Sequence, residues 1–313
     1  MIWANLSFLK NKESSENMVL NVSGRTDIVA FYTSWFMNRY HEGFFDVRNP
    51  FYKKQVSRIY FKDVDLIVFC TKNPLPILDH LNEIKIPMVF HITITPYKKD
   101  IEPNVIDKKL IIAAVKKISS IVGKEYTVVR YDPIFLSPKY DLNYHLKCFE
   151  RLCEQLDGYI NHIIVSFIDE YKNVKNNSKI LNIREPNEED YEIIGTSFSN
   201  IAKKHNITVQ TCAEKQNLVQ YGFIKSDCLT PNMVFKLTGL TKMKKWTSRK
   251  TPYCDCVEMV DVGAYNTCLH FCKYCYANYS EKEVIKNNKL HNPASSLLIG
   301  EIESDDIIKV RKK

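Results

Sequence analysis

Six short apolar runs constrain the fold of this 313-residue chain more than any other feature. Each run is continuous and rich in β-branched residues, which is typical of a strand that is buried on both faces. Each run ends in polar residues that lead into a helical pattern, and strands that alternate with helices form parallel sheets with right-handed crossovers. The runs are residues 19–22, 65–70, 88–94, 126–130, 162–167 and 207–211.

Amphipathic segments between the runs predict the crossover helices. Residues 27–43 end at Gly43 and residues 106–123 end at Gly123, as expected from the preference of glycine for helix ends. Residues 187–206 open with acids and close with bases, as the helix dipole favours. We therefore expect an α/β fold, either a (βα) barrel or a six-stranded, partial TIM-type barrel, with a doubly wound sheet as the alternative. The apolar positions at helical spacing in the second segment are Leu110, Ile111, Ala114, Val115, Ile118 and Ile121.

Polar residues follow every predicted strand. In a parallel barrel the carboxyl ends of the strands meet on one face, where ligands bind. We expect these residues to form an active-site mouth, although caps and turns explain any one of them equally well. Arg130 and Asp132 make the strongest pair, with a structural ion pair as the alternative. The set is Arg25, Asp27, Thr71, Lys72, Asn73, Thr95, Arg130, Asp132, Ser166, Asp169, Cys212 and Glu214.

The βα rhythm stops after about residue 221, which predicts a second, smaller unit. We expect an N-terminal extension over residues 1–18, the barrel over 19–225, a cysteine-rich module over 226–295 that closes on the barrel, and a tail over 296–313. No run approaches the roughly 18 apolar residues of a membrane span, and the first residues lack the pattern of a secretory signal. We expect a cytoplasmic protein with no membrane partner.

Ten cysteines are many for a cytoplasmic protein, and half of them lie between Cys254 and Cys275. Thiols in a reducing compartment seldom form disulfides, so clustering indicates metal ligation. Cys268, Cys272 and Cys275 have the spacing C-x3-C-x2-C, whereas structural zinc sites usually pair cysteines as C-x2-C with a second pair elsewhere. Three thiolates on one loop suit a four-iron cluster that keeps one iron open to a small molecule.

At these residues the sequence resembles the radical S-adenosylmethionine (radical SAM) superfamily. Its signature, C-x3-C-x-aromatic-C, is matched by the three cysteines and by Tyr274. The context CKYCYAN is similar to spore photoproduct lyase. The wider layout, with SGRTDI, FCTKNP, RYDP and the late cysteines, resembles an uncharacterised bacterial family of the domain-of-unknown-function type over about residues 19–280.

The resemblance implies a full or partial (βα) barrel, a 4Fe-4S cluster and SAM as cofactor. One electron would cleave SAM to a 5′-deoxyadenosyl radical that abstracts a substrate hydrogen, and a flavodoxin or ferredoxin with its reductase would supply the electron. Cys268, Cys272 and Cys275 would hold the cluster. The catalytic candidates are Arg25, Asp27, Arg130 and Asp132, and the cofactor-binding candidates are Thr71, Lys72, Asn73, Asp169, Glu214 and Tyr274.

Two features depart from the superfamily pattern. The cysteine triad follows the sixth predicted strand, whereas in radical SAM enzymes it follows the first. No Gly-Gly-Glu follows the second predicted strand, where the superfamily holds the SAM amino group, and residues 71–74 (TKNP) stand there instead.

Four further cysteines suggest a second metal site, either zinc or an auxiliary cluster. Cys254 and Cys256 form a C-x-C pair around an aspartate, which suits an exposed, ligating turn, and Cys212 and Cys228 would complete a tetrahedral set. The alternative is that Cys212 and Cys228 are buried thiols that serve as small hydrophobes.

A function of another class also fits the composition. The formal net charge is +8, and residues 242–250 carry five cations with Trp246, a combination that can bind phosphates and stack on bases. The alternative function is a nucleic-acid-binding barrel with a structural zinc module and no redox chemistry. A solvated linker explains the same basic stretch. The substrate, whether a small molecule or a nucleic acid, is not indicated.

Overall fold

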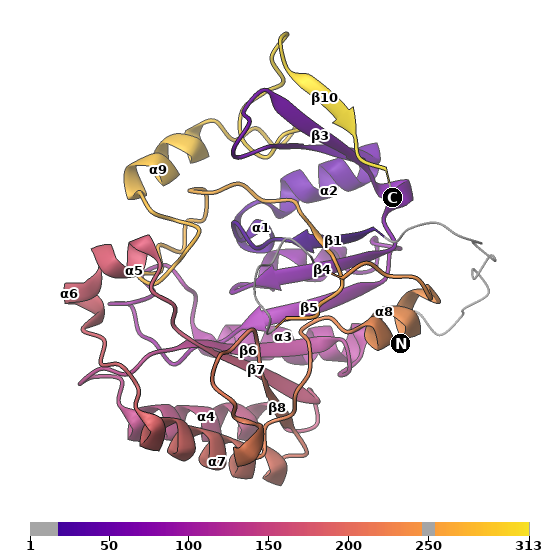
Figure 1. Ribbon diagram of the computed structural model, residues 1–313. Coiled ribbons are helices and arrows are strands. Elements are labelled where there is room, and N and C mark those ends of the chain that lie inside the picture. Colours follow the sequence, from indigo (N-terminus) through magenta and orange to yellow (C-terminus); the bar gives the residue numbers. More distant parts are fainter. Residues whose placement is uncertain (1–17, 246–253, 313) are drawn as a thin grey trace.

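The computed structural model describes residues 18–245 and 254–312. Its centre is a seven-stranded sheet with the order β8-β7-β6-β5-β4-β1-β9, in which every neighbouring pair is parallel (Figure 1). The expected α/β class is confirmed. The strands are β1 (Val19–Val22), β4 (Leu66–Thr71), β5 (Met88–Thr93), β6 (Thr127–Ile134), β7 (His162–Phe167), β8 (Thr208–Thr211) and β9 (Val260–Asp261).

The strand order follows the chain order from β1 to β8. All six predicted runs are strands, and they lie side by side without the reversal at which a doubly wound sheet changes direction. A seventh strand that the sequence did not predict, β9, lies beyond β1 at the far edge. Among the described residues the edge strands β8 and β9 do not pair with each other, so the sheet is open.

Helices cover the outer face of the sheet. The predicted glycine stop is present at Gly43, which has a left-handed φ of 86° and caps α2. Leu110 was expected on the buried side of α3 but is 50% exposed, because Ile111, Ala114, Val115 and Ile118 face the sheet instead. The rings of Phe149 in α4 and Phe198 in α7 stack with their centroids 3.7 Å apart. The outer elements are α1 (Ile28–Phe31), α2 (Thr33–Glu42), η2 (Leu75–His80), α3 (Lys108–Val122), α4 (Leu142–Leu156) and α7 (Glu188–Lys204).

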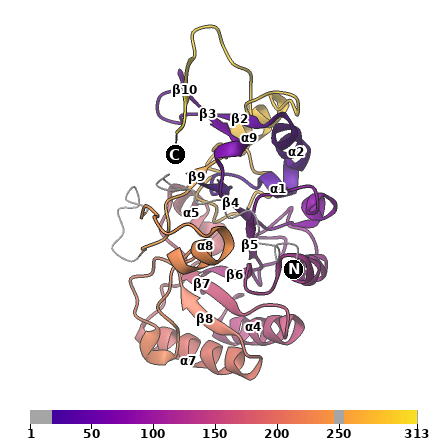
Figure 2. The ribbon, with the colours of Figure 1, turned by 90° about the vertical axis from the view of Figure 1, so that its right-hand side faces the viewer.

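The inner face of the sheet has its own core. Side chains from the amino-terminal halves of the strands, among them Val68, Val89 and Val128, pack against Val234 and Leu237 of α8 (Pro231–Thr238). Figure 2 shows α8 on the side of the sheet opposite α1, α2 and α4. Alternation along each strand then places polar residues on the same face nearer the carboxyl ends. These are Asn21, Cys70, His91, Thr93, Arg130, Asp132, Ser166, Gln210 and Cys212.

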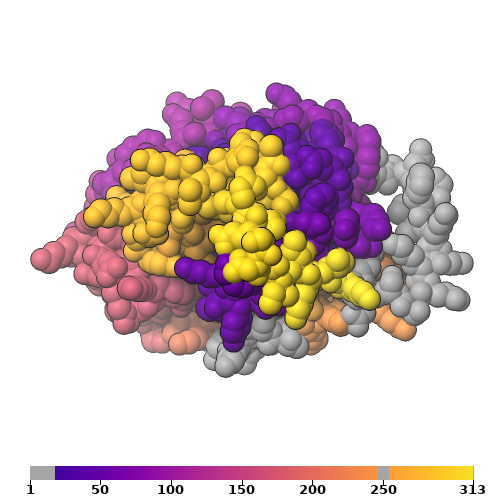
Figure 3. Space-filling view, turned by 90° about the horizontal axis from the view of Figure 1, so that it is seen from above, coloured from indigo at the N-terminus to yellow at the C-terminus, as the bar shows by residue number. Residues whose placement is uncertain are grey.

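The carboxyl-terminal residues are built into the body of the protein. Residues 226–295, expected as a separate module, supply α8, β9 and part of the inner core. Residues 296–313, expected as a tail, contain β10 (Ile307–Val310), which pairs with β3 (Gln55–Tyr60) beside β2 (Phe44–Arg48). Figure 3 shows these residues lying across the top of the molecule. Short elements complete the chain: η1 (Phe61–Asp63), α5 (Lys172–Asn176), α6 (Ser178–Leu181), η3 (Val219–Tyr221) and α9 (Glu281–Lys289).

None of the helices in the described part of the chain is both long and apolar enough to cross a bilayer.

Candidate functional site

Strand β9 brings the cysteine triad to the sheet. It pairs with β1 in the register Asn21 to Asp261, and the Asp261 carboxylate accepts hydrogen bonds from the Gly24 amide at 2.6 Å and the Ser23 hydroxyl at 3.1 Å. The Arg25 Nε donates to the same carboxylate at 2.9 Å. Arg25, a catalytic candidate, is therefore engaged in holding β9 against the end of β1, and Asp261 is an anchor that the sequence did not reveal.

The triad loop lies over the carboxyl ends of β1 and β4. Asp27 accepts from the Ala30 amide at 2.9 Å as the cap of α1 and from the Lys72 amide at 2.7 Å just after β4. Its Oδ2 also lies 2.9 Å from Nε2 of His270, which stands between Cys268 and Cys272. One carboxylate thus joins the loop after β1, the loop after β4 and the triad loop, so the triad shares the strand-end face with Arg25 and Thr71.

The three thiols are largely enclosed. Cys268 and Cys272 are buried and Cys275 is partly buried. Burial raises the pKa of all three thiols. The Cys275 sulfur accepts backbone hydrogen bonds from Ala277 and Asn278, which favour its thiolate. In the described structure the sulfurs of Cys268, Cys272 and Cys275 do not all lie within 4.8 Å of one another.

Glu102 forms a charged centre beside the triad. It is 1% exposed, and its carboxylate meets the Thr95 hydroxyl at 2.7 Å, the Lys72 ammonium at 2.9 Å, the Lys108 ammonium and the Tyr274 hydroxyl. Burial alone would raise the pKa of Glu102, but the two ammonium groups outweigh it and lower this pKa to about 2. The only sequence signal for Glu102 is its place in a strand-end loop.

Lys72 and Tyr274, both cofactor-binding candidates, therefore meet at Glu102. The Lys72 ammonium lies 5.5 Å from the centroid of the Tyr274 ring, within the range of a cation–π contact. The other candidates after β4 serve the local turn, because Thr71 Oγ1 accepts from the Asn73 amide at 2.9 Å and Asn73 Oδ1 accepts from the Leu75 amide at 3.2 Å.

Arg130 and Asp132 form the predicted pair on β6. Arg130 Nε and Nη2 donate to Asp132 Oδ2 at 2.9 and 2.5 Å, and both side chains are mostly buried. Ser166 Oγ lies 3.4 Å from the same oxygen. Arg130 Nη1 also lies 3.3 Å from the Cys228 sulfur, so the guanidinium bridges the carboxylate and a thiol.

Glu214 and Asp169 follow β8 and β7. Glu214 Oε1 accepts from the Phe167 amide at 2.8 Å, and burial, with nearby Asp169 and Cys212, raises its pKa to about 7. Asp169 is exposed and accepts from the Tyr171 hydroxyl at 3.1 Å. The two cofactor-binding candidates thus lie with the Arg130 pair and not with the triad.

The four remaining candidate ligands lie in a row. The sulfurs of Cys212 and Cys228 are 2.9 Å apart. Cys228 forms a side-chain hydrogen bond with Cys256, and Cys256 forms one with Cys254. The ligand atoms that lie within 4.8 Å of one another, however, belong to Cys254, Cys256 and Asp227. Asp227 is a residue that the sequence did not single out. The basic stretch 242–250 lies partly outside the described residues, Trp246 included, and its Lys245 pairs with Asp255 at 3.1 Å.

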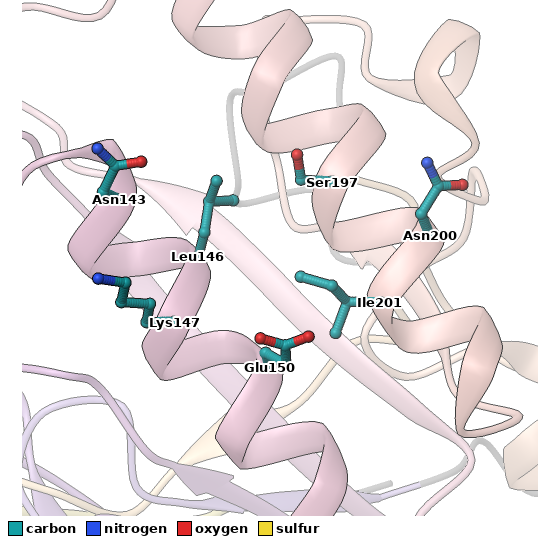
Figure 4. A pocket seen from close by; sticks show the side chains of 7 residues that line it. All are labelled: Asn143, Leu146, Lys147, Glu150, Ser197, Asn200 and Ile201. Carbon is teal, nitrogen blue, oxygen red and sulfur yellow. The ribbon is translucent and has the colours of Figure 1, made fainter.

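The described surface is hollowed in at least two places. A groove of about 430 Å³ runs between α4 and α7 on the outer layer and contains none of the candidate residues (Figure 4). A smaller hollow of about 250 Å³ lies between α5 and the triad loop and reaches Cys272. Asn173, Asn177, Lys273 and Tyr279 are among its walls.

Fold and site together define a parallel α/β protein with a thiol-rich site at its strand ends. The chain belongs to the family described as "Domain of unknown function (DUF1848)", whose model matches residues 19–277, and the expected membership of such a family is confirmed. The curated proteins contain no match. A solved sugar phosphate isomerase/epimerase from Parabacteroides distasonis is similar at 9% identity and a TM-score of 0.28, over 65% of this chain and 53% of that one. The chain thus spans about half the length of that protein.

Proposed function

We propose that the protein is an iron–sulfur enzyme of the radical SAM type, acting on a substrate that is not yet known. The observation that carries the proposal is the position of Cys268, Cys272 and Cys275 on one loop that Asp27 joins to the carboxyl ends of β1 and β4. Ligands of parallel sheets bind at that edge. We also propose that the open sheet is a partial barrel.

The residues around the triad fit an iron–sulfur cluster. The donors are three thiols, which soft metal centres prefer, and the Cys275 sulfur already accepts two backbone hydrogen bonds of the kind that tune such clusters. The triad is not gathered as tightly as one ion requires, since Zn–S bonds of about 2.3 Å place sulfurs about 3.8 Å apart. Two buried polar atoms of the same loop, His270 Nδ1 and Asn278 Oδ1, have no partner in the described structure.

The sheet order bears on the main departure from the superfamily pattern. In chain order the triad follows the sixth predicted strand, but in the sheet it follows β9, the edge strand next to β1. The triad therefore lies beside the end of the first strand, which it follows directly in the superfamily.

When bound, the cluster would supply the electron that cleaves SAM and so gives the radical that abstracts a substrate hydrogen. Glu102 holds the Lys72 ammonium and the Tyr274 hydroxyl, which we propose flank the cofactor. Arg130 and Asp132, on the inner face of the same sheet, orient the substrate. Glu214, whose pKa of about 7 makes it able to exchange a proton near neutrality, lies beside them. A flavodoxin or ferredoxin with its reductase is the proposed electron donor.

Anaerobic purification and reconstitution test the proposal. We expect iron and acid-labile sulfide, broad visible absorption, and 5′-deoxyadenosine after addition of SAM and a reductant. Zinc at the triad with no iron under these conditions would refute the proposal and favour the nucleic-acid-binding alternative. A cluster that forms without any release of 5′-deoxyadenosine would keep the metal centre and reject the SAM chemistry.

A further inference from the structure

A second group of metal-ligand side chains lies away from the triad, on two segments that run beside each other. Asp227 and Cys228 come from one segment, and Cys254 and Cys256 come from the other. The segments are joined by the Asp255 amide, which donates to Asp227 Oδ1 at 2.8 Å, and by the Val257 amide, which donates to the Leu229 carbonyl at 3.2 Å. Two backbone amides of one segment therefore hold it beside the other, one through the Asp227 carboxylate and one through the Leu229 carbonyl.

The spacing of this group suits a single ion. One ligand atom each of Asp227, Cys254 and Cys256 lies within 4.8 Å of the other two. Cys228 Sγ is hydrogen-bonded to Cys256, and both residues are buried, with Cys256 only 1% exposed. A tetrahedral zinc site needs four ligand atoms about 3.8 Å apart, so small side-chain rotations, the largest at Cys228, would complete the set.

A hydrogen-bond donor or a cation lies beside two of the sulfurs. The backbone of Leu229 hydrogen-bonds the Cys256 sulfur, and the Arg130 guanidinium lies 3.3 Å from the Cys228 sulfur. Thiolates, not thiols, are metal ligands, and amide donors with a nearby cation are what stabilises them. The other acidic group of similar compactness, Glu303 with Asp305 and Asp306, is already neutralised by Lys54 and Arg48.

We propose that Cys254, Cys256, Asp227 and Cys228 bind one thiophilic divalent cation of the zinc class in a closed, structural site. Cys212 is not a ligand in this assignment. Its sulfur contacts Cys228 at 2.9 Å and the Arg130 guanidinium, whereas Cys228 also hydrogen-bonds Cys256 of the compact group. The site shares no residue with the triad, so it stands independently of the proposed radical chemistry.

The site has a clear structural task. Between α8, which ends at Thr238, and β9, which begins at Val260, the described residues form no helix or named strand, only the isolated bridge between Lys245 and Val257. This connection must place β9 against β1, and β9 in turn places the triad. Metal binding stabilises such irregular segments directly, because the site does not exist in the unfolded chain.

Metal analysis of the full-length protein tests the assignment. We expect one zinc per chain in the wild type and in Cys272→Ala, whose triad is broken. Asp227→Asn and Cys256→Ser should lose zinc, while Cys212→Ser and the control Cys148→Ser, in α4, should retain it. Loss of zinc from Cys212→Ser with retention in Asp227→Asn would overturn the ligand set.

Cobalt substitution supplies a readout that needs no variant. Co²⁺ added to the metal-free wild type should give the intense thiolate-to-cobalt band of a tetrahedral site, and the band should weaken when zinc is added. Absence of this band, together with absence of zinc in the purified protein, would overturn the site. Cys272→Ala removes the proposed cluster and not this site. The zinc analysis and the cobalt spectrum therefore test this site even if the radical SAM proposal fails.

Discussion

The two clusters of cysteines in this chain offer sulfur ligands in opposite arrangements. The triad of Cys268, Cys272 and Cys275 comes from one loop, yet its sulfurs are not gathered within 4.8 Å. Cys254 and Cys256 come together with Asp227 from distant segments, within that distance. A single ion needs ligands about 3.8 Å apart, whereas a cluster shares its ligands among several irons. Spacing, more than the number of cysteines, therefore separates the two sites.

The groups also differ in how they are attached to the sheet. The triad loop is fixed by two buried carboxylates, because Asp27 contacts His270 and Glu102 accepts a hydrogen bond from the Tyr274 hydroxyl. The second group is fixed by two backbone amides of one segment, which donate to the Asp227 carboxylate and the Leu229 carbonyl of the other. Removing the Glu102 charge should therefore disturb the triad and leave the second group in place.

The largest expected effect comes from Cys272→Ala. Removing one of three cluster ligands should abolish iron binding and reduce 5′-deoxyadenosine formation to background, while the zinc content stays at the wild-type level. Iron, sulfide and zinc analysis of the anaerobic protein measures this. Cys148→Ala, which removes a thiol from α4, is the control and should change neither metal. Loss of both metals from Cys272→Ala would show that the two sites are one.

Glu102→Gln should give the next largest effect. Its pKa falls from 4.5 to about 2 in the folded protein, so its ionised form stabilises the fold by about 3 kcal/mol at neutral pH. The variant should lose about that much, because Lys72 and Lys108 keep their charges without a partner. Urea unfolding of the metal-free proteins at pH 7 measures the loss.

The pH dependence of this difference has a definite sign. The contribution is present above the unfolded-state pKa near 4.5 and is lost as the pH falls toward 2, so wild type and Glu102→Gln should converge in acid. Glu125→Gln is the matched control, because Glu125 pairs with the exposed Lys236, and its effect should stay below about 1 kcal/mol at any pH. A constant difference between pH 7 and pH 3 would contradict the assigned role of Glu102.

Gly263→Ala should have the smallest effect on stability but a selective one on the triad. A Cβ atom there would lie 2.0 Å from Ser23 Oγ, so β9 must move away from β1 at a cost of about 1–3 kcal/mol. Iron retention should fall while zinc remains. The double variant Ser23→Ala with Gly263→Ala removes the clashing oxygen and should recover part of the lost stability and iron. Equal losses in the single and double variants would contradict this reading of the β9 contact.

The main strands were predictable because burial on both faces leaves a strong signal. The runs that became β1, β4, β5, β6, β7 and β8 are short, mostly apolar and rich in β-branched residues, and the few polar residues within them, such as Asn21 and His91, do not hide that pattern. Strand β9 was not predictable, since Val260 and Asp261 are too few to show a period. The pairing of β10 with β3 was missed for another reason: its four residues are all exposed and carry no core signal.

The candidate site was predictable in its ligands and not in its contacts. The spacing of the three cysteines is local, and thiols at that spacing indicate metal ligation before any fold is known. Glu102, Asp227 and Asp261 were missed because each is an ordinary acid with no motif in the residues around it. Their roles arise only where segments far apart in the chain meet, as when Asp261 reaches Gly24 or Glu102 reaches Tyr274.

The sequence by itself determined the α/β class, the six main strands and the spacing of the cysteine triad. Each of these depends on residues that are neighbours in the chain, through β-branching, burial pattern and cysteine spacing. Only the tertiary structure decided that a strand from the end of the chain lies beside β1 and that the triad reaches the strand ends. The physical reason is that these contacts satisfy buried charges and edge hydrogen bonds across more than 230 residues, as between Asp27 and His270, and no local pattern encodes such partners.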